Sequence, residues 1–191
     1  MSKKALVLCG SPRKTGNTEF VTENLIGYLS DDVEAEKYYI ADMNISPCND
    51  CGFCAKTQGC AIKDDMQSLY KKIDEADIII VSSPLYFNNV SAQLKTVIDR
   101  CQAIWASKFV LKEPMINQDK NRVGHFICTA GCENVDFSGT LMVMDLFFKV
   151  ANAQYLGNTL LEFTDNSPAS HRDNLLYELK GVGEKLCSWI F

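Results

Sequence analysis

One short stretch near the start of the chain has the residue types that bind phosphate. Residues 10–18 read GSPRKTGNT and lie between an apolar run, residues 5–9, and an amphipathic stretch, residues 20–29. A strand, a small polar loop and a helix, in that order, present free backbone N–H groups at the helix end that favours an anion. Gly10 and Gly16 allow close approach of a ligand. Short polar donors and two cations complete this predicted phosphate loop: Ser11, Thr15, Asn17, Thr18, Arg13 and Lys14.

The loop differs from two common nucleotide-binding motifs. A Walker A motif places a lysine directly after its second glycine, whereas Asn17 follows Gly16 here. The G-x-G-x-x-G dinucleotide pattern is also absent from the sequence. An ordinary polar connection between a strand and a helix remains the alternative to a phosphate site.

The second group that could do chemistry is a run of four cysteines. Cys48, Cys51, Cys54 and Cys60 have the spacing C-x2-C-x2-C-x5-C. The first three match a ferredoxin run, in which short arcs place sulfurs at successive corners of an iron–sulfur cluster. The fourth spacing departs from that run, and no proline follows it. Structural zinc is a second interpretation, although zinc ribbons usually have a longer gap between cysteine pairs, and cysteines without a metal are the third.

The other cysteines and the histidines have structural interpretations. We expect Cys9, Cys101, Cys128, Cys132 and Cys187 to be buried or incidental rather than ligands. His125 falls within a predicted strand and is expected to be packed. No pattern in the sequence indicates a hydrolytic triad.

Hydrophobic periodicity predicts strands that alternate with helices along the chain. Asp64 and Gln67 have the spacing of a capping box at a helix start. This alternation is typical of an α/β doubly wound parallel sheet with helices on both faces. The expected strands are residues 4–9, 34–40, 77–81, 122–129 and 154–163; the expected helices are residues 17–29, a helix opened by Asp64, and residues 90–105, 137–151 and 175–190; residues 44–63 and 105–121 are expected to be irregular.

In such a sheet, ligands bind beyond the carboxyl ends of the strands. Residues 82–89 carry Tyr86 and Phe87 after a proline turn, which suits a flat ring, and residues 129–132 are mostly small. We expect both segments to meet the phosphate loop and form a mononucleotide-type site. The alternative is that the two aromatic residues belong to the core.

Three segments together resemble the NAD(P)H-dependent FMN reductase family of flavodoxin-like proteins: residues 10–18, residues 83–95 and the pair Asp99-Arg100. The resemblance covers nearly the whole chain and implies a five-stranded sheet, in the order 2-1-3-4-5, that binds FMN. It implies phosphate contacts from Ser11, Arg13, Asn17 and Thr18. It also implies contacts to the isoalloxazine ring from residues 84–88 and 129–131. The cofactor-binding set is expected to be Ser11, Arg13, Lys14, Gly16, Asn17, Thr18, Pro84, Leu85, Tyr86, Phe87, Asn88, Thr129, Ala130 and Gly131.

The resemblance also implies an activity. FMN would take a hydride from NAD(P)H and pass electrons to a second acceptor, which is a quinone, a nitro or azo compound, a flavin or a protein. The cysteine run resembles that of the iron–sulfur flavoproteins, a branch of the family, which implies Cys48, Cys51, Cys54 and Cys60 as ligands of a [4Fe–4S] cluster. Because the flavin carries the chemistry, we assign no catalytic acid, base or nucleophile. The alternatives are an electron carrier without its own NAD(P)H activity and a non-catalytic redox sensor.

Length, charge and composition further limit the class of protein. We expect the 191 residues to form one domain, residues 1–191, and the net charge of −5 argues against a general nucleic-acid binder. No apolar run has the length of a membrane span, and the first strand leaves no room for a signal peptide, so we expect a cytoplasmic protein. An odd number of cysteines, nine, argues against a disulfide framework there. Members of the resembled family are commonly homodimers or homotetramers, and residues 90–121 are the expected contact.

Overall fold

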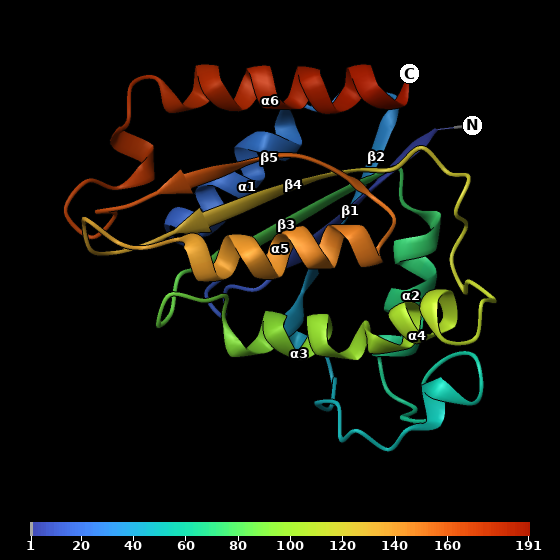
Figure 1. Ribbon diagram of the computed structural model, residues 1–191. Helices are drawn as coiled ribbons and strands as arrows, with labels where there is room; N and C mark the ends of the chain where they lie inside the picture. The colour runs from blue at the N-terminus through green and yellow to red at the C-terminus, as the bar shows by residue number, and fades with distance from the viewer. Residues whose placement is uncertain (1) are drawn as a thin grey trace.

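The structure is a computed structural model that describes residues 2–191. Its five strands form one parallel sheet in the order β2-β1-β3-β4-β5 (Figure 1), which confirms the predicted doubly wound fold. The order reverses between β1 and β3, where such folds bind their ligands. The strands are β1 Lys3–Cys9, β2 Val33–Tyr39, β3 Ile78–Pro84, β4 Val123–Thr129 and β5 Gln154–Leu161.

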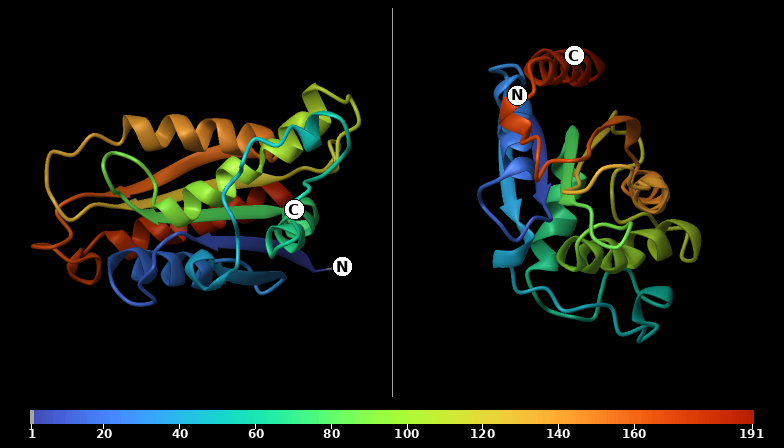
Figure 2. Two further views of the ribbon diagram at one scale, coloured as in Figure 1. Left: turned by 90° about the horizontal axis from the view of Figure 1, so that it is seen from below. Right: turned by 90° about the vertical axis from the view of Figure 1, so that its left-hand side faces the viewer.

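Helices cover both faces of the sheet (Figures 1 and 2). Helices α1 and α6 lie on one face, and α2, α3 and α5 lie on the other. Across residues 2–191, no helix has the length and apolar character that crossing a bilayer requires. The helices are α1 Asn17–Gly27, α2 Met66–Glu75, α3 Ala92–Arg100, α4 Gln102–Phe109, α5 Ser138–Val150 and α6 Leu175–Ile190.

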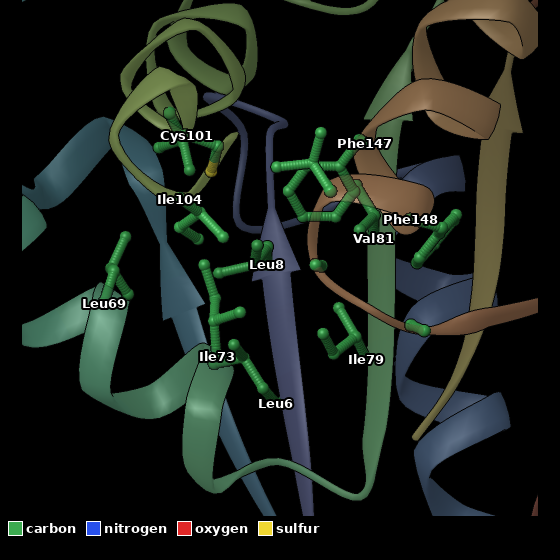
Figure 3. Close-up of a cluster of buried hydrophobic side chains, with 14 of the residues drawn as sticks. Leu6, Leu8, Leu69, Ile73, Ile79, Val81, Cys101, Ile104, Phe147 and Phe148 are labelled. Atoms are coloured by element: carbon green, nitrogen blue, oxygen red, sulfur yellow. The ribbon is translucent and has the colours of Figure 1, made fainter. Parts of the chain in front are cut away.

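Successive side chains of the central strands point to opposite faces of the sheet, so the core has two layers. In β1, Leu6 and Leu8 face the layer beneath α2, α3 and α5, while Val7 faces α1 and α6. Figure 3 shows the first layer, in which Ile73 of α2 and Phe147 of α5 lie over the strands. Strands buried on both faces are continuous apolar runs. Burial of this kind holds the strand ends, and therefore the loops that follow them, in fixed positions.

The structure corrects the expected boundaries after α3. The predicted helix of residues 90–105 is interrupted at Cys101, and a separate helix, α4, continues to Phe109, so residues 105–109 are helical rather than irregular. Helix α4 forms because Ala103 and Ile104 are buried in the core. The hydroxyl of Ser107 also accepts the N–H of Met115 at 3.1 Å, which holds the following chain against the helix.

The expected capping box at the start of α2 is not formed. The side-chain amide of Gln67 donates to the carbonyls of Cys60 and Ile62, at 3.3 and 2.6 Å, rather than reaching back along the helix. The Asp64 carboxylate accepts the Met66 N–H at 3.1 Å but also binds the guanidinium of Arg100. A buried cation is the stronger partner for the carboxylate, and a local spacing rule takes no account of it.

Candidate functional site

Loops after β1, β3, β4 and β5 converge on one pocket at the carboxyl edge of the sheet. Figure 2, right, shows the end of the molecule where these loops lie. Ten of the predicted cofactor-binding residues line the pocket: Ser11, Arg13, Gly16, Asn17, Thr18, Pro84, Leu85, Tyr86, Thr129 and Gly131. The structure thus brings together segments that are more than a hundred residues apart in the chain.

The first loop leaves the start of α1 open. Gly16 precedes the helix with φ of +110°, a conformation that favours glycine. Within residues 2–191, no side chain caps the first N–H groups of α1. The buried hydroxyl of Ser11 accepts the Arg13 N–H at 3.2 Å and so tightens the loop. Uncapped N–H groups at a helix N-terminus form a binding site for an anion.

Asn17 and Thr18 hold the pocket together through their side chains. The amide of Asn17 donates to the Thr164 carbonyl at 3.1 Å and accepts the Ala169 N–H at 2.8 Å. The hydroxyls of Thr18 and Thr129 lie 2.6 Å apart, and both residues are buried. The first loop is therefore fastened to the ends of both β4 and β5.

Four of the predicted cofactor-binding residues lie outside the lining of this pocket. The ammonium group of Lys14 pairs with Asp42 at 2.5 Å. Phe87 and Asn88 form the exposed tip of the second loop, where both have positive φ. Ala130 is buried beneath the third loop.

Three residues of the pocket were not in the predicted cofactor-binding set: Thr164, Asp165 and Thr15, the last of which had been expected only as a polar donor of the phosphate loop. Thr164 and Asp165 follow β5, and an added Cβ at Gly131 would lie 2.4 Å from a carboxylate oxygen of Asp165. Glycine at position 131 therefore permits the close approach of this acidic residue. Polar residues just after the last predicted strand were the signal for both positions, because that strand ends at the same edge as the others.

The four clustered cysteines line a second pocket, which shares no lining residue with the first among residues 2–191. It lies between the loop of residues 44–63 and α4, and the short 3-10 turn Phe53–Ala55 contacts that helix. Burial, together with the nearby cysteine thiols, raises the pKa of Cys54. The structure thus places the four cysteines around one pocket.

The donor set suits a thiolate-bound metal group, but the sulfurs are not drawn tightly together. In the part of the chain that the structure describes, no three His, Cys, Asp or Glu side chains are placed to hold a metal ion. The pocket is nevertheless lined by the four cysteines and by Arg100, whose Nε is buried without a hydrogen-bond partner. Four thiols and one unused donor fit an anionic, sulfur-ligated group, and ligation would require the loop to tighten.

The remaining titratable groups of the core have structural roles. His125 is buried, its Nε2 lies 2.9 Å from the Thr159 hydroxyl, and burial lowers its pKa to about 4. Burial raises the pKa of Cys9 to about 11 and the pKa values of Cys101 and Cys128 to about 12. These three thiols are protonated at neutral pH and lie within the hydrophobic core. Cys132 is exposed, and Cys187 is half-buried.

The arrangement of the sheet defines the class of fold. A solved NAD(P)H:quinone oxidoreductase from Methanothermobacter marburgensis has a TM-score of 0.71 to this chain at 18% sequence identity. The match covers 97% of this chain and 96% of that one. The likeness shows that the chain has the flavodoxin-like fold of that oxidoreductase.

Sequence comparison gives the family. Residues 3–162 match the family described as NADPH-dependent FMN reductase, and the chain belongs to that family of NAD(P)H-dependent flavin oxidoreductases. An iron-sulfur flavoprotein from Methanocaldococcus jannaschii is 31% identical over 182 residues, which are 95% of this chain and 83% of that protein. One from Archaeoglobus fulgidus is 39% identical over 103 residues, 53% of this chain and 52% of that protein. The second match therefore spans about half of each of the two proteins.

Proposed function

We propose that the pocket at the carboxyl edge of the sheet binds FMN and uses it to oxidise NAD(P)H. The proposal rests mainly on one observation: four loops meet above the uncapped start of α1. When bound, FMN supplies the chemistry, accepting a hydride from NAD(P)H and giving electrons to a second acceptor. The protein supplies binding, orientation and charge.

Each wall of the pocket has a role in this proposal. Ser11, Gly16 and the first N–H groups of α1 hold the phosphate, and Arg13 adds a positive charge. Pro84, Leu85 and Tyr86 border the isoalloxazine ring on one side, and Thr129 and Gly131 border it on the other. The Leu85 N–H donates to the Thr129 carbonyl at 2.8 Å, so a backbone hydrogen bond joins the two walls.

We further propose that Cys48, Cys51, Cys54 and Cys60 hold a [4Fe–4S] cluster that relays electrons to or from the flavin. The pocket that the four cysteines line and the similarity to two iron-sulfur flavoproteins support this assignment. The second acceptor is a quinone, a nitro or azo compound, a free flavin or a protein. Exposed thiols in this loop require reducing conditions, which favours the cytoplasm.

One preparation tests the proposal. Protein purified without oxygen is analysed for FMN, iron and zinc, and then assayed for oxidation of NADH and NADPH with each class of acceptor. Bound FMN, about four irons per chain and nicotinamide oxidation support the full proposal. Bound FMN and iron without nicotinamide oxidation support an electron carrier instead. Zinc, or FMN without metal, contradicts the cluster, and failure to bind added FMN contradicts the central assignment.

We also propose that the chain works as a homodimer or homotetramer. The support is an apolar groove between α3, α4 and α5, which includes Ile98, Trp105, Val143 and Leu146. Large apolar side chains beside a groove of this kind are typical of a surface that another chain covers.

A further inference from the structure

A buried arginine joins the cysteine loop to the core. Arg100 is the last residue of α3, and only 1% of it is exposed. One terminal nitrogen donates to the Ser46 carbonyl and to the Asp64 carboxylate, each at 2.7 Å. The other donates to the second carboxylate oxygen of Asp64 at 3.1 Å. Ser46 lies just before the first of the four cysteines and Asp64 just after the last, so one guanidinium holds both ends of the loop.

The ends of the loop are also fastened to each other. The Asp64 carboxylate accepts the Ser46 N–H at 2.9 Å, so a hydrogen bond closes the loop across its base. From the first turn of α2, Gln67 donates to the carbonyl of Cys60. The base of the loop is thus fixed, while the segment that carries Cys48 and Cys51 is exposed.

One donor of the same arginine is unused. Across residues 2–191, only Arg100 Nε and the Thr140 hydroxyl are buried side-chain atoms without a hydrogen-bond partner. Native proteins rarely leave a buried N–H unpaired, because it has lost its water without gaining an acceptor. Arg100 lines the pocket of the four cysteines. A group ligated there would bring sulfur, which can accept a hydrogen bond, closer to the unpaired Nε–H.

We propose that Arg100 is a positioning residue for the group held by the four cysteines. Its Nε–H donates to a sulfur of that group, its charge offsets the negative charge of the thiolates, and its terminal nitrogens fix the ends of the loop. This inference rests on the proposed cluster. Hydrogen bonds to sulfur and net charge both set the reduction potential of an iron–sulfur cluster, and outer partners of this kind orient the ligands themselves. A lysine retains the charge but lacks the planar set of donors.

The test uses the complete protein, purified without oxygen, and its Arg100→Lys variant. We expect equal FMN content, a more negative midpoint potential of the cluster in a redox titration, and iron release to a chelator about tenfold faster or more. Arg122→Lys is the matched control. Arg122 is equally buried and donates to carbonyls of Ala76, Ala151 and Asp74, yet it lines a pocket without cysteines. This control is expected to keep the wild-type potential.

The outcomes distinguish a wrong cluster assignment from a wrong role for Arg100. If the wild type binds FMN but no iron, the cluster is wrong and so is the role of Arg100. If the wild type binds iron and Arg100→Lys matches it in potential and iron release, the cluster stands and the role of Arg100 is wrong. Should Arg100→Lys fail to fold, Asp64→Asn provides the test. Removing the carboxylate leaves the guanidinium charge uncompensated, so the potential is expected to rise, and an unchanged potential overturns the proposal.

Discussion

Two adjacent cations in the first loop have different surroundings in the structure, and the sequence alone does not distinguish them. Arg13 and Lys14 are equivalent in the sequence, since both lie near the start of α1. In the structure only Arg13 lines the pocket, whereas Lys14 turns to Asp42 and lies over the ring of Tyr39. The partners of Lys14 lie on the neighbouring strand β2 and just beyond it, so the difference depends on tertiary structure.

Arg13→Ala is expected to weaken FMN binding by about tenfold or more, because a charge-assisted contact to phosphate contributes about 1.5–3 kcal/mol. Fluorescence titration of the flavin-free protein measures the dissociation constant. Lys14→Ala is the matched control and is expected to change that constant by less than about threefold, the scale of a partly screened surface charge. Equal losses in the two variants would show that the loop attracts phosphate by net charge rather than through Arg13.

The buried imidazole of His125 makes the stability of the fold depend on pH. Its pKa is about 4 in the folded protein, because burial and, secondarily, the charge of Lys185 disfavour the protonated form. The unfolded chain has the ordinary value of about 6.5. Between these values the unfolded state binds a proton that the folded state does not, so the free energy of unfolding falls as the pH falls.

His125→Asn is therefore expected to reduce this acid sensitivity while retaining a partner for Thr159. Between pH 7 and pH 4.5 the histidine alone costs the wild type about 2 kcal/mol. Urea unfolding of both proteins at the two pH values isolates this contribution, because the other titrating groups are shared. Parallel losses in wild type and variant would mean that His125 is protonated without opposing the fold.

At the scale of elements, the contact between Thr18 and Thr129 joins helix α1 to strand β4. Their hydroxyls lie 2.6 Å apart in a buried setting. Removal of one hydroxyl leaves the other buried without its partner, at a cost of about 1–3 kcal/mol, whereas removal of both avoids that penalty. The pair thus links the anion-binding end of α1 to the loop that follows β4.

Thr18→Val and Thr129→Val are each expected to lower the free energy of unfolding by about 1–3 kcal/mol. The double variant is expected to lose less than the sum of the single losses, with a coupling energy of about 1 kcal/mol. Urea unfolding of the wild type, the two single variants and the double variant measures this double-mutant cycle. Additive losses would show that the two hydroxyls act independently, and the helix and strand would then be joined by packing alone.

The elements themselves were largely predictable from the sequence. The β-branched apolar run at residues 78–81 is typical of a buried strand, and the spacing of Leu175, Leu179 and Leu186 is typical of a helix. The features that the sequence did not predict share a cause. The carboxylate of Asp64 is bound by Arg100, which is distant in sequence, and Asp165 reaches the pocket only through the placement of β5. Periodicity and capping rules describe neighbours along the chain, so such partners are outside their reach.

At the scale of the whole molecule, the apolar groove between α3, α4 and α5 borders the cysteine pocket. Gln102 and Trp105 line both. On α5, Leu146 lines the groove and is 60% exposed. A second copy of the chain seated on this groove would bury these apolar side chains and cover the rim of the cysteine pocket, which limits the access of water and oxygen to it.

Leu146→Glu is expected to convert the proposed assembly into a smaller one, because a carboxylate buried at an apolar interface without a partner is costly. Light scattering coupled to gel filtration measures the mass of wild type and variant. Tyr177→Glu is the control, since Tyr177 is 82% exposed on α6, on the opposite face of the sheet. We expect it to retain the wild-type mass. Dissociation by Tyr177→Glu but not by Leu146→Glu would move the interface to α6, and a wild type with the mass of one chain would contradict the assembly altogether.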